Sequence, residues 1–446
     1  MGKVFMGKGD AEELKVGMEL ELFLLDEDGN VVFDADKIIK LTKKISEKVY
    51  IKHECAKNMV ELGARPDPNP QKTLKDMFIN VENILVTAEK EGYILLPLGA
   101  YPGEFNPDMR NNISYKIKKQ IFGEKRFQIA GRVCGFHYHY QLPFHIPFIQ
   151  SISVLQFLDL KYVHNLLNGF NFMIALDPAL NCFMQSSPFY QGEYIGKDSR
   201  TIVYRGGKIL KYDKGLYSEY QEFGALQGYK YSIFDIIEMI REMFERWTKG
   251  IKGLGINIKT LSLYGSTLGT SWNPVKINKL GTLEQRGSDM NHPKNIIAAT
   301  AMMKYIMKMI YEKELEITPS QIGNENPFKI DGRKLYVPEE KYLINILQVQ
   351  SAYKGMESQV VYNYCLELYR LAEKAMPSKK KYLLDPLKEM LDKKMTVSDE
   401  ILAFARKRGW KNGEILSKQI ARDIAKQHAS RLFKELVLSR KYLEDI

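Results

Sequence analysis

Three short segments of the chain carry paired side chains of the types that can ligate metal ions or bind phosphate. The pairs are Glu19 and Glu21, His137 and His139, and Glu284 and Arg286. Side chains two residues apart share one face of a β-strand, so each segment is expected to form a strand with a polar and an apolar face. One pair alone would more simply be a solvated sheet face. Three pairs favour a metal site, because cations offset the repulsion between gathered carboxylates and imidazoles and the cost of burying them.

Five segments that contain or accompany these pairs follow one another in an order typical of a known family. They read VGMELELFLLDEDG, CAKNMVELGARP, GFHYHYQLP, SSPFYQGEYIGKDSR and GTLEQRGSD, from residue 16 to about residue 290. The chain resembles the glutamate-cysteine ligase and carboxylate-amine ligase family, a branch of the glutamine synthetase superfamily. The resemblance implies ATP-dependent amide bond formation. A carboxylate, usually the γ-carboxylate of glutamate, accepts the γ-phosphoryl group of ATP, and an amine then displaces phosphate.

The resemblance also implies a role for each matching residue. The implied metal ligands are Glu19, Glu21, Glu54, Glu61, His137 and Glu284. His139 would contact the phosphates of ATP, and Arg286 would stabilise the transferred phosphoryl group. Arg200 would bind substrate or phosphate, and Arg205, which is near it in the sequence, is a further candidate. Glu54 and Glu61 are seven residues apart, which would place them on opposite faces of one regular strand. A turn or irregular stretch is therefore expected between them.

Two departures from the family pattern concern substrate choice. The family often has a threonine soon after the carboxylate that matches Glu61, where this chain continues with Leu62, Gly63 and Ala64. The family also tends to have Gly-Thr-His-Pro where this chain reads Gly-Ala-Tyr-Pro at residues 99–102. The metal-ligand set is intact, whereas the identities of the amine and of the carboxylate stay open.

The expected fold is α+β and glutamine-synthetase-like. A curved antiparallel sheet would form a funnel for two or three divalent cations, with helices packed on its outer face. Apolar spacing and capping residues predict helices over residues 36–49, 69–92, 154–175, 232–247 and 293–314, and the start of another helix at Thr396 and Asp399. A strand is predicted over 93–98 and a loop over 377–381. We expect a catalytic domain over residues 1–330 and a helical, basic C-terminal extension over residues 331–446.

Composition is that of a large enzyme expected in the cytoplasm. The chain has 446 residues, 45% of them hydrophobic, and we expect neither a signal peptide nor a membrane-spanning run. The cysteines, Cys55, Cys134, Cys182 and Cys365, have no metal or disulfide spacing, so reduced thiols are expected. The net charge of +11 is interpreted as heat adaptation rather than nucleic-acid binding. The basic cluster of Arg406, Lys407, Arg408 and Lys411 is interpreted as a solvated helix end.

The favoured function is a glutamate-cysteine ligase-like carboxylate-amine ligase that uses ATP and Mg²⁺, with Mn²⁺ as an alternative ion, and releases ADP and phosphate. Its expected partners are small-molecule substrates, neither membrane nor nucleic acid, and a homo-oligomer is left open. Two alternatives stay open: a phosphotransferase of the same superfamily, and a catalytically silent regulator that binds nucleotide or RNA.

Overall fold

A sheet of seven strands forms the centre of the molecule. The computed structural model describes residues 14–46, 49–142, 160–255 and 267–444. The strands β2 (Ile51–His53), β3 (Met59–Gly63), β1 (Val16–Asp26), β5 (Gly135–Gln141), β9 (Thr282–Asp289) and β8 (Val275–Asn278) follow one another across the sheet, and β4 (Tyr93–Leu96) pairs with the end of β1. Every pairing in this sheet is antiparallel. The predicted combination of helices with an antiparallel sheet is confirmed.

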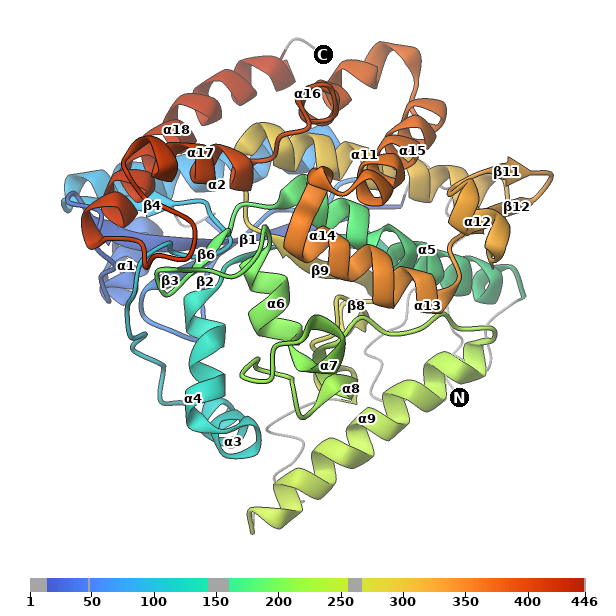
Figure 1. Cartoon of the computed structure of the whole chain (residues 1–446), viewed down its shortest axis with the longest axis horizontal. Helices are drawn as coiled ribbons and strands as arrows, with labels where there is room; N and C mark the ends of the chain where they lie inside the picture. Colours follow the sequence, from blue (N-terminus) through green and yellow to red (C-terminus); the bar gives the residue numbers. More distant parts are fainter. Residues whose placement is uncertain (1–13, 47–48, 143–159, 256–266, 445–446) are drawn as a thin grey trace.

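Long helices pack on the sheet and on one another. Helix α2 (Pro70–Lys90) contacts β1, β3 and β4, and α5 (Leu160–Met184) contacts β9. Helix α11 (Pro293–Glu312) contacts both α2 and α5. In Figure 1, α2 and α11 lie above the sheet and α5 lies to its right, whereas α3 (Ile113–Phe122), α4 (Glu124–Phe127) and α9 (Ile233–Gly253) lie below it. The sheet therefore lies between two groups of helices.

The remaining elements are short or C-terminal. They are α1 (Ala35–Ile45), α6 (Ser199–Arg205), α7 (Gly207–Leu210), α8 (Gln221–Gly224), α12 (Gln321–Glu325), α13 (Glu340–Tyr342), α14 (Gln348–Lys354), α15 (Gln359–Ala375), α16 (Asp385–Lys393), α17 (Val397–Lys407), α18 (Lys418–Glu444), the hairpin of β6 (Phe189–Tyr190) and β7 (Glu193–Tyr194), and a small sheet of β10 (Glu316–Pro319), β11 (Ile330–Asp331) and β12 (Lys334–Val337). Among the described residues, no helix has the length and apolar composition needed to cross a membrane.

The predicted starts of three helices are confirmed by their caps. The side chain of Asn69 accepts a hydrogen bond from the Gln71 amide at the start of α2. Ser232 and Asp235 form the capping box of α9, and Thr396 and Asp399 form that of α17. The ends were less predictable: α1 stops at Ile45 and α5 continues to Met184, while residues 154–159 of the latter prediction lie outside the described residues.

The loop predicted at residues 377–381 is wrong for all but its first residue. Residues Ser378–Leu384 form a 3₁₀ helix. The Lys380 amide donates to the Pro377 carbonyl at 2.8 Å, and Leu383 and Leu384 are buried beneath the turn. Burial of these leucines holds the lysine-rich stretch in a helical turn, an effect that its local composition does not reveal.

The C-terminal helices pack into the same core as the sheet. Helix α15 contacts α5 and α11, and α18 contacts α2 and β4. The core formed by buried side chains runs from Leu14 to Leu443 without a break at residue 330. The division into a catalytic domain and an extension stays a prediction.

Candidate active site

A row of polar side chains crosses four adjacent strands. Antiparallel register places Glu61 of β3 opposite Glu21 of β1, Glu19 of β1 opposite His137 of β5, and His139 of β5 opposite Glu284 of β9. Directly opposed side chains on one face have Cβ atoms about 4.5–5.5 Å apart. The structure thus brings together all three pairs that the two-residue spacing singled out.

Glu54 joins the row through a turn. Strands β2 and β3 form a hairpin, and Glu54 directly follows β2, so the turn expected between Glu54 and Glu61 is present. Ligand atoms of Glu21, Glu54 and Glu61 lie within 4.8 Å of one another, as do those of Glu19, His139 and Glu284. The described residues therefore contain two groups of three that could each hold a cation.

His137 lies between these two groups. Its Nδ1 is 3.3 Å from Glu19 Oε2 and its Nε2 is 3.5 Å from Glu21 Oε1. The pairing of β5 with β9 shifts register between Phe136 and Tyr138, so His137 occupies the irregular position of its strand. His139, which the family resemblance assigns to ATP phosphates, is the histidine that belongs to a group of three. The division of roles between the two histidines stays a prediction.

The donor set fits hard divalent cations. The Nε2 atoms of His137 and His139 are buried and have no hydrogen-bond partner among the described residues, although each has a carboxylate oxygen at 3.5 or 3.7 Å. Carboxylates are the ligands that suit Mg²⁺ and Mn²⁺, and imidazole adds a nitrogen donor of the kind that transition-metal ions accept. Burial without hydrogen bonding is costly unless the nitrogen ligates an ion or receives a proton.

Burial also perturbs the carboxylates of the row. Burial raises the pKa of Glu21 to about 7, although the positive charge of Arg200 lowers it. Burial and the negative charges of Glu19 and Glu54 raise the pKa of Glu61 to about 8. Although burial also disfavours ionised Glu19, hydrogen bonds with His137 and His139 hold its pKa far below the ordinary range. The two groups therefore differ: one holds carboxylates that favour a proton, the other a carboxylate that stays charged.

Two lysines lie at the two edges of the row, and the sequence analysis identified neither of them. Lys52 of β2 lies opposite Glu61, and its Nζ is 2.9 Å from Glu61 Oε1 and 3.1 Å from Glu19 Oε1. Lys276 of β8 lies opposite Glu284, with its Nζ 3.5 Å from Glu284 Oε2. A signal was present, because Lys276 alternates with the apolar Val275 and Ile277, and Lys52 is two residues before Glu54.

Arg286 and Arg200 line one cavity but have different hydrogen-bond partners. Arg286 Nη1 is 3.2 Å from Glu284 Oε1, and Arg200 donates hydrogen bonds to the backbone carbonyls of Gly287 at 2.8 Å and Arg286 at 3.2 Å. A Cβ atom at Gly135 would lie 2.4 Å from the Arg200 guanidinium, so this glycine makes the room that Arg200 occupies. Both arginines line the same cavity beside the row.

Arg205 points into the core instead. Its guanidinium donates to both oxygens of Asp177, at 2.7 and 2.9 Å, and to Gln348 at 2.7 Å. Its side chain is 3% exposed and Asp177 is fully buried. Arg205 lines neither of the two cavities at the row, so the structure does not bring it together with the other predicted site residues.

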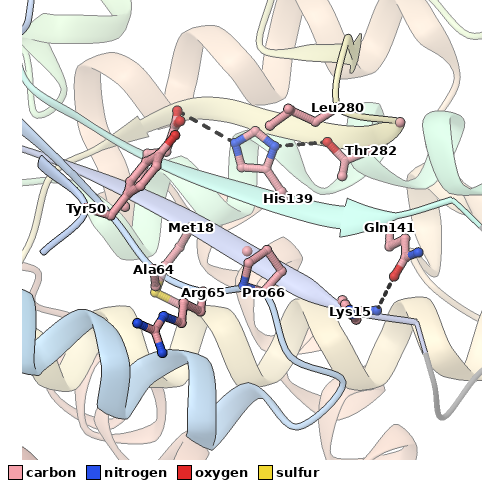
Figure 2. Close-up of a pocket in the computed structure, with 14 residues that line it drawn as sticks. Lys15, Met18, Tyr50, Ala64, Arg65, Pro66, His139, Gln141, Leu280 and Thr282 are labelled. Atoms are coloured by element: carbon pink, nitrogen blue, oxygen red, sulfur yellow. Dashed lines mark hydrogen bonds and ion pairs between the residues drawn. The ribbon is translucent and has the colours of Figure 1, made fainter. Parts of the chain in front are cut away.

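Two cavities lie on opposite sides of the row. The larger, about 570 Å³, is shown in Figure 2, where His139 contacts Thr282 beneath Leu280 and beside Tyr50. The smaller is about 140 Å³. Its polar lining includes Glu21, Glu54, Lys118, Arg200 and Arg286, and its aromatic wall consists of Tyr115, Phe127, Tyr204, Tyr217 and Trp272. The sequence analysis missed this wall and Lys118, which come from segments far apart in the chain.

The C-terminal region holds the segment that leads to Arg200. Lys197 forms ion pairs with Asp399 and with Glu357, the latter at 2.6 Å, and Ser398 donates to the Lys197 carbonyl at 2.6 Å. The Leu416 amide donates to the Gly192 carbonyl at 2.8 Å, at a tight turn in which Gln191 and Gly192 both have positive φ. The position of Arg200 thus depends on contacts with residues beyond 350.

Comparison with known proteins places the chain in a family. A sequence model of glutamate-cysteine ligase family 2 matches residues 15–419. No curated protein matches the sequence. The solved structure of glutamate-cysteine ligase from Francisella tularensis in complex with AMP is 14% identical, with a TM-score of 0.52, and the match covers 97% of each chain.

A bifunctional glutathione synthetase from Pasteurella multocida is 13% identical, with a TM-score of 0.51. The match covers 96% of this chain but only 52% of that protein, so the chain spans about half its length. At these identities the two structures show a shared fold, whereas the sequence model covers most of the chain. The chain therefore belongs to glutamate-cysteine ligase family 2.

Proposed function

We propose that the protein joins the γ-carboxylate of glutamate, or of a close analogue, to an amine through an acyl phosphate. The observation that carries the proposal is the row of carboxylates and histidines between two cavities of different character. Such a row can stand between a nucleotide and a second substrate. The curved, glutamine-synthetase-like funnel belongs to the same proposal.

The larger cavity suits the nucleotide. Its volume of about 570 Å³ lies within the roughly 300–1,000 Å³ typical of ligand pockets. Met18, Tyr50, Pro66 and Leu280 offer apolar contacts for a base, while Glu19 and His139 mark the edge that faces the row. The triphosphate would then extend along the row, where His139 Nε2 can contact a phosphate oxygen.

The metal ions would be held by Glu19, Glu284 and a histidine in one group and by Glu21, Glu54 and Glu61 in the other. Bound Mg²⁺, or Mn²⁺ in its place, would neutralise the phosphate charge. Arg286 faces the smaller cavity and is positioned to stabilise the charge on the transferred phosphoryl group, and Arg200 to bind the substrate beside it.

The proposed chemistry has two steps. A carboxylate oxygen attacks the γ-phosphorus, and the bond to the bridging oxygen of ADP breaks. The amine nitrogen then attacks the acyl carbon, the C–O bond breaks, and inorganic phosphate leaves with the bonding electron pair while the amine loses a proton. Binding of both substrates in one enclosed site makes each step an effectively unimolecular reaction between bound groups.

The test supplies ATP, Mg²⁺ and pools of amino acids and amines, and identifies the products by mass. We expect ADP, phosphate and an amide, formed only when a carboxylate and an amine are both present. Formation of AMP with an adenylated carboxylate would contradict the proposal. A phosphorylated end product made without any amine would favour a phosphotransferase instead.

A further inference from the structure

Among the described residues, one cation of the smaller cavity, Lys118, differs from the other two in having neither a carboxylate nor a backbone carbonyl as a partner. Arg286 is paired with Glu284, and Arg200 donates to two carbonyls. The Nζ of Lys118, on helix α3, lies 4.6 Å from the centroid of the Trp272 ring and 5.5 Å from that of Tyr115. Among the residues with described positions, no carboxylate oxygen lies within 4.0 Å of this Nζ.

The aromatic contacts hold the ammonium without neutralising it. A cation over a ring face is attracted to the ring, but the ring carries no net charge. Burial, assisted by the charge of Arg286, lowers the pKa of Lys118 to about 8. A cation in these surroundings gains most from a bound anion.

The cavity needs such an anion-binding group if it is to accept an acidic substrate. Glu21 and Glu54 line it and repel carboxylates. Arg200 and Arg286 lie with the polar row, where the reacting carboxylate would be, whereas Lys118 lies against Tyr115 and Trp272 of the aromatic wall. The volume of about 140 Å³ restricts the occupant to a small metabolite.

We propose that Lys118 is a specificity-determining residue whose ammonium binds a second carboxylate of the substrate, the one that is not phosphorylated. This inference rests on the proposed function and deepens it. The enzyme then selects dicarboxylates, because a monocarboxylate leaves the ammonium without an anion in a partly dehydrated cavity.

The test compares Lys118→Met with Lys116→Met, which removes the same charge from an exposed position on the same helix. Calorimetry measures binding of L-glutamate, glutarate and 4-aminobutyrate, which lacks the second carboxylate. We expect the wild type to prefer L-glutamate and glutarate. Lys118→Met should weaken both by about 10- to 100-fold, the effect of losing a charge-assisted hydrogen bond, and change 4-aminobutyrate binding by less than about threefold.

The Lys116→Met variant should behave as wild type, and Lys118→Arg, which keeps the positive charge, should retain more of the preference than Lys118→Met. Equal weakening of the binding of all three ligands, or a wild type that does not prefer the dicarboxylates, would overturn the inference.

ADP release measured on the same preparations separates the two proposals. If dicarboxylates bind in a Lys118-dependent way but no ADP is released, the ligase function is refuted and the proposed carboxylate-binding site is supported. If ADP is released but Lys118→Met keeps the wild-type preference for dicarboxylates, the role of Lys118 is refuted and the ligase function is supported.

Discussion

The cavities on the two sides of the polar row are lined by different kinds of side chain. On one side, Met18, Tyr50, Pro66 and Leu280 surround about 570 Å³ with mostly apolar atoms. On the other, three cations, two carboxylates and an aromatic wall surround about 140 Å³. The first can bind a flat, partly apolar ligand of nucleotide size, and the second a small charged one. The row lies between the two cavities, so substitutions in the row should slow the reaction more than substitutions in either cavity.

The largest effect is expected from the row itself. Glu284→Gln and Glu19→Gln nearly preserve shape while removing one ligand charge each. Turnover should fall by roughly two orders of magnitude or more, the scale of losing several kcal/mol of transition-state stabilisation. Activity is measured as a function of Mg²⁺, with Glu104→Gln at an exposed position as the control. Unchanged turnover of both variants at low Mg²⁺ would remove these residues from the site.

A smaller effect is expected at the boundary between the row and the smaller cavity. Arg286→Lys keeps a positive charge but loses the planar fork that can contact two oxygens of a phosphoryl group. ATP and Mg²⁺ should bind nearly as in the wild type, while single-turnover ADP formation slows by about 10- to 100-fold. If the variant instead melts at a lower temperature and forms ADP at the wild-type rate per folded molecule, Arg286 serves only to pair with Glu284.

A reciprocal pair of substitutions sharpens the comparison of the cavities. Ala64 lines the larger cavity and Ala130 the smaller. Leucine at either position removes space, and poor packing of this kind costs about 1–3 kcal/mol. Ala64→Leu should raise the KM for ATP about tenfold or more and leave that for the carboxylate unchanged, and Ala130→Leu should do the opposite. Equal effects of both variants on both substrates would contradict the assignment of one ligand to each cavity.

The smallest predicted effect concerns pH. The pKa values of Glu21 and Glu61 are raised to about 7 and about 8, so the folded protein binds more protons than the unfolded chain above about pH 4.5. Stability without divalent ions should therefore fall as pH rises toward 8. Mg²⁺ competes with these protons, so its stabilisation should be greater at pH 8 than at pH 6, on the order of 1 kcal/mol. Thermal melts with and without Mg²⁺ measure this difference, and Glu61→Gln should reduce it.

The sequence predicted the row better than the cavities around it. A spacing of two residues requires only local strand geometry, so the faces of β1, β5 and β9 could be predicted, and the odd spacing of Glu54 and Glu61 predicted their turn. The caps at Asn69 and Ser232 were equally local. The walls are not local, because Tyr115, Tyr217 and Trp272 come together only through tertiary packing.

Arg200 and Arg205 show the same limit within a single helix. Both belong to α6, and five positions along a helix rotate the side chain by about 140° from its starting direction. One guanidinium consequently lines the smaller cavity and the other pairs with buried Asp177. Family motifs identified both arginines as candidates, and only the helix position distinguishes them.

Transfer of an isotope tests the central claim most directly. A carboxylate substrate labelled with ¹⁸O at the reacting group is incubated with ATP, Mg²⁺ and an amine, and the inorganic phosphate is analysed by mass. If the carboxylate attacks the γ-phosphorus, the C–O bond breaks when the amine attacks, and one labelled oxygen must leave with phosphate. Label in the released phosphate, together with unlabelled ADP, is the predicted result. Unlabelled phosphate, or label recovered in AMP, would contradict the acyl-phosphate mechanism.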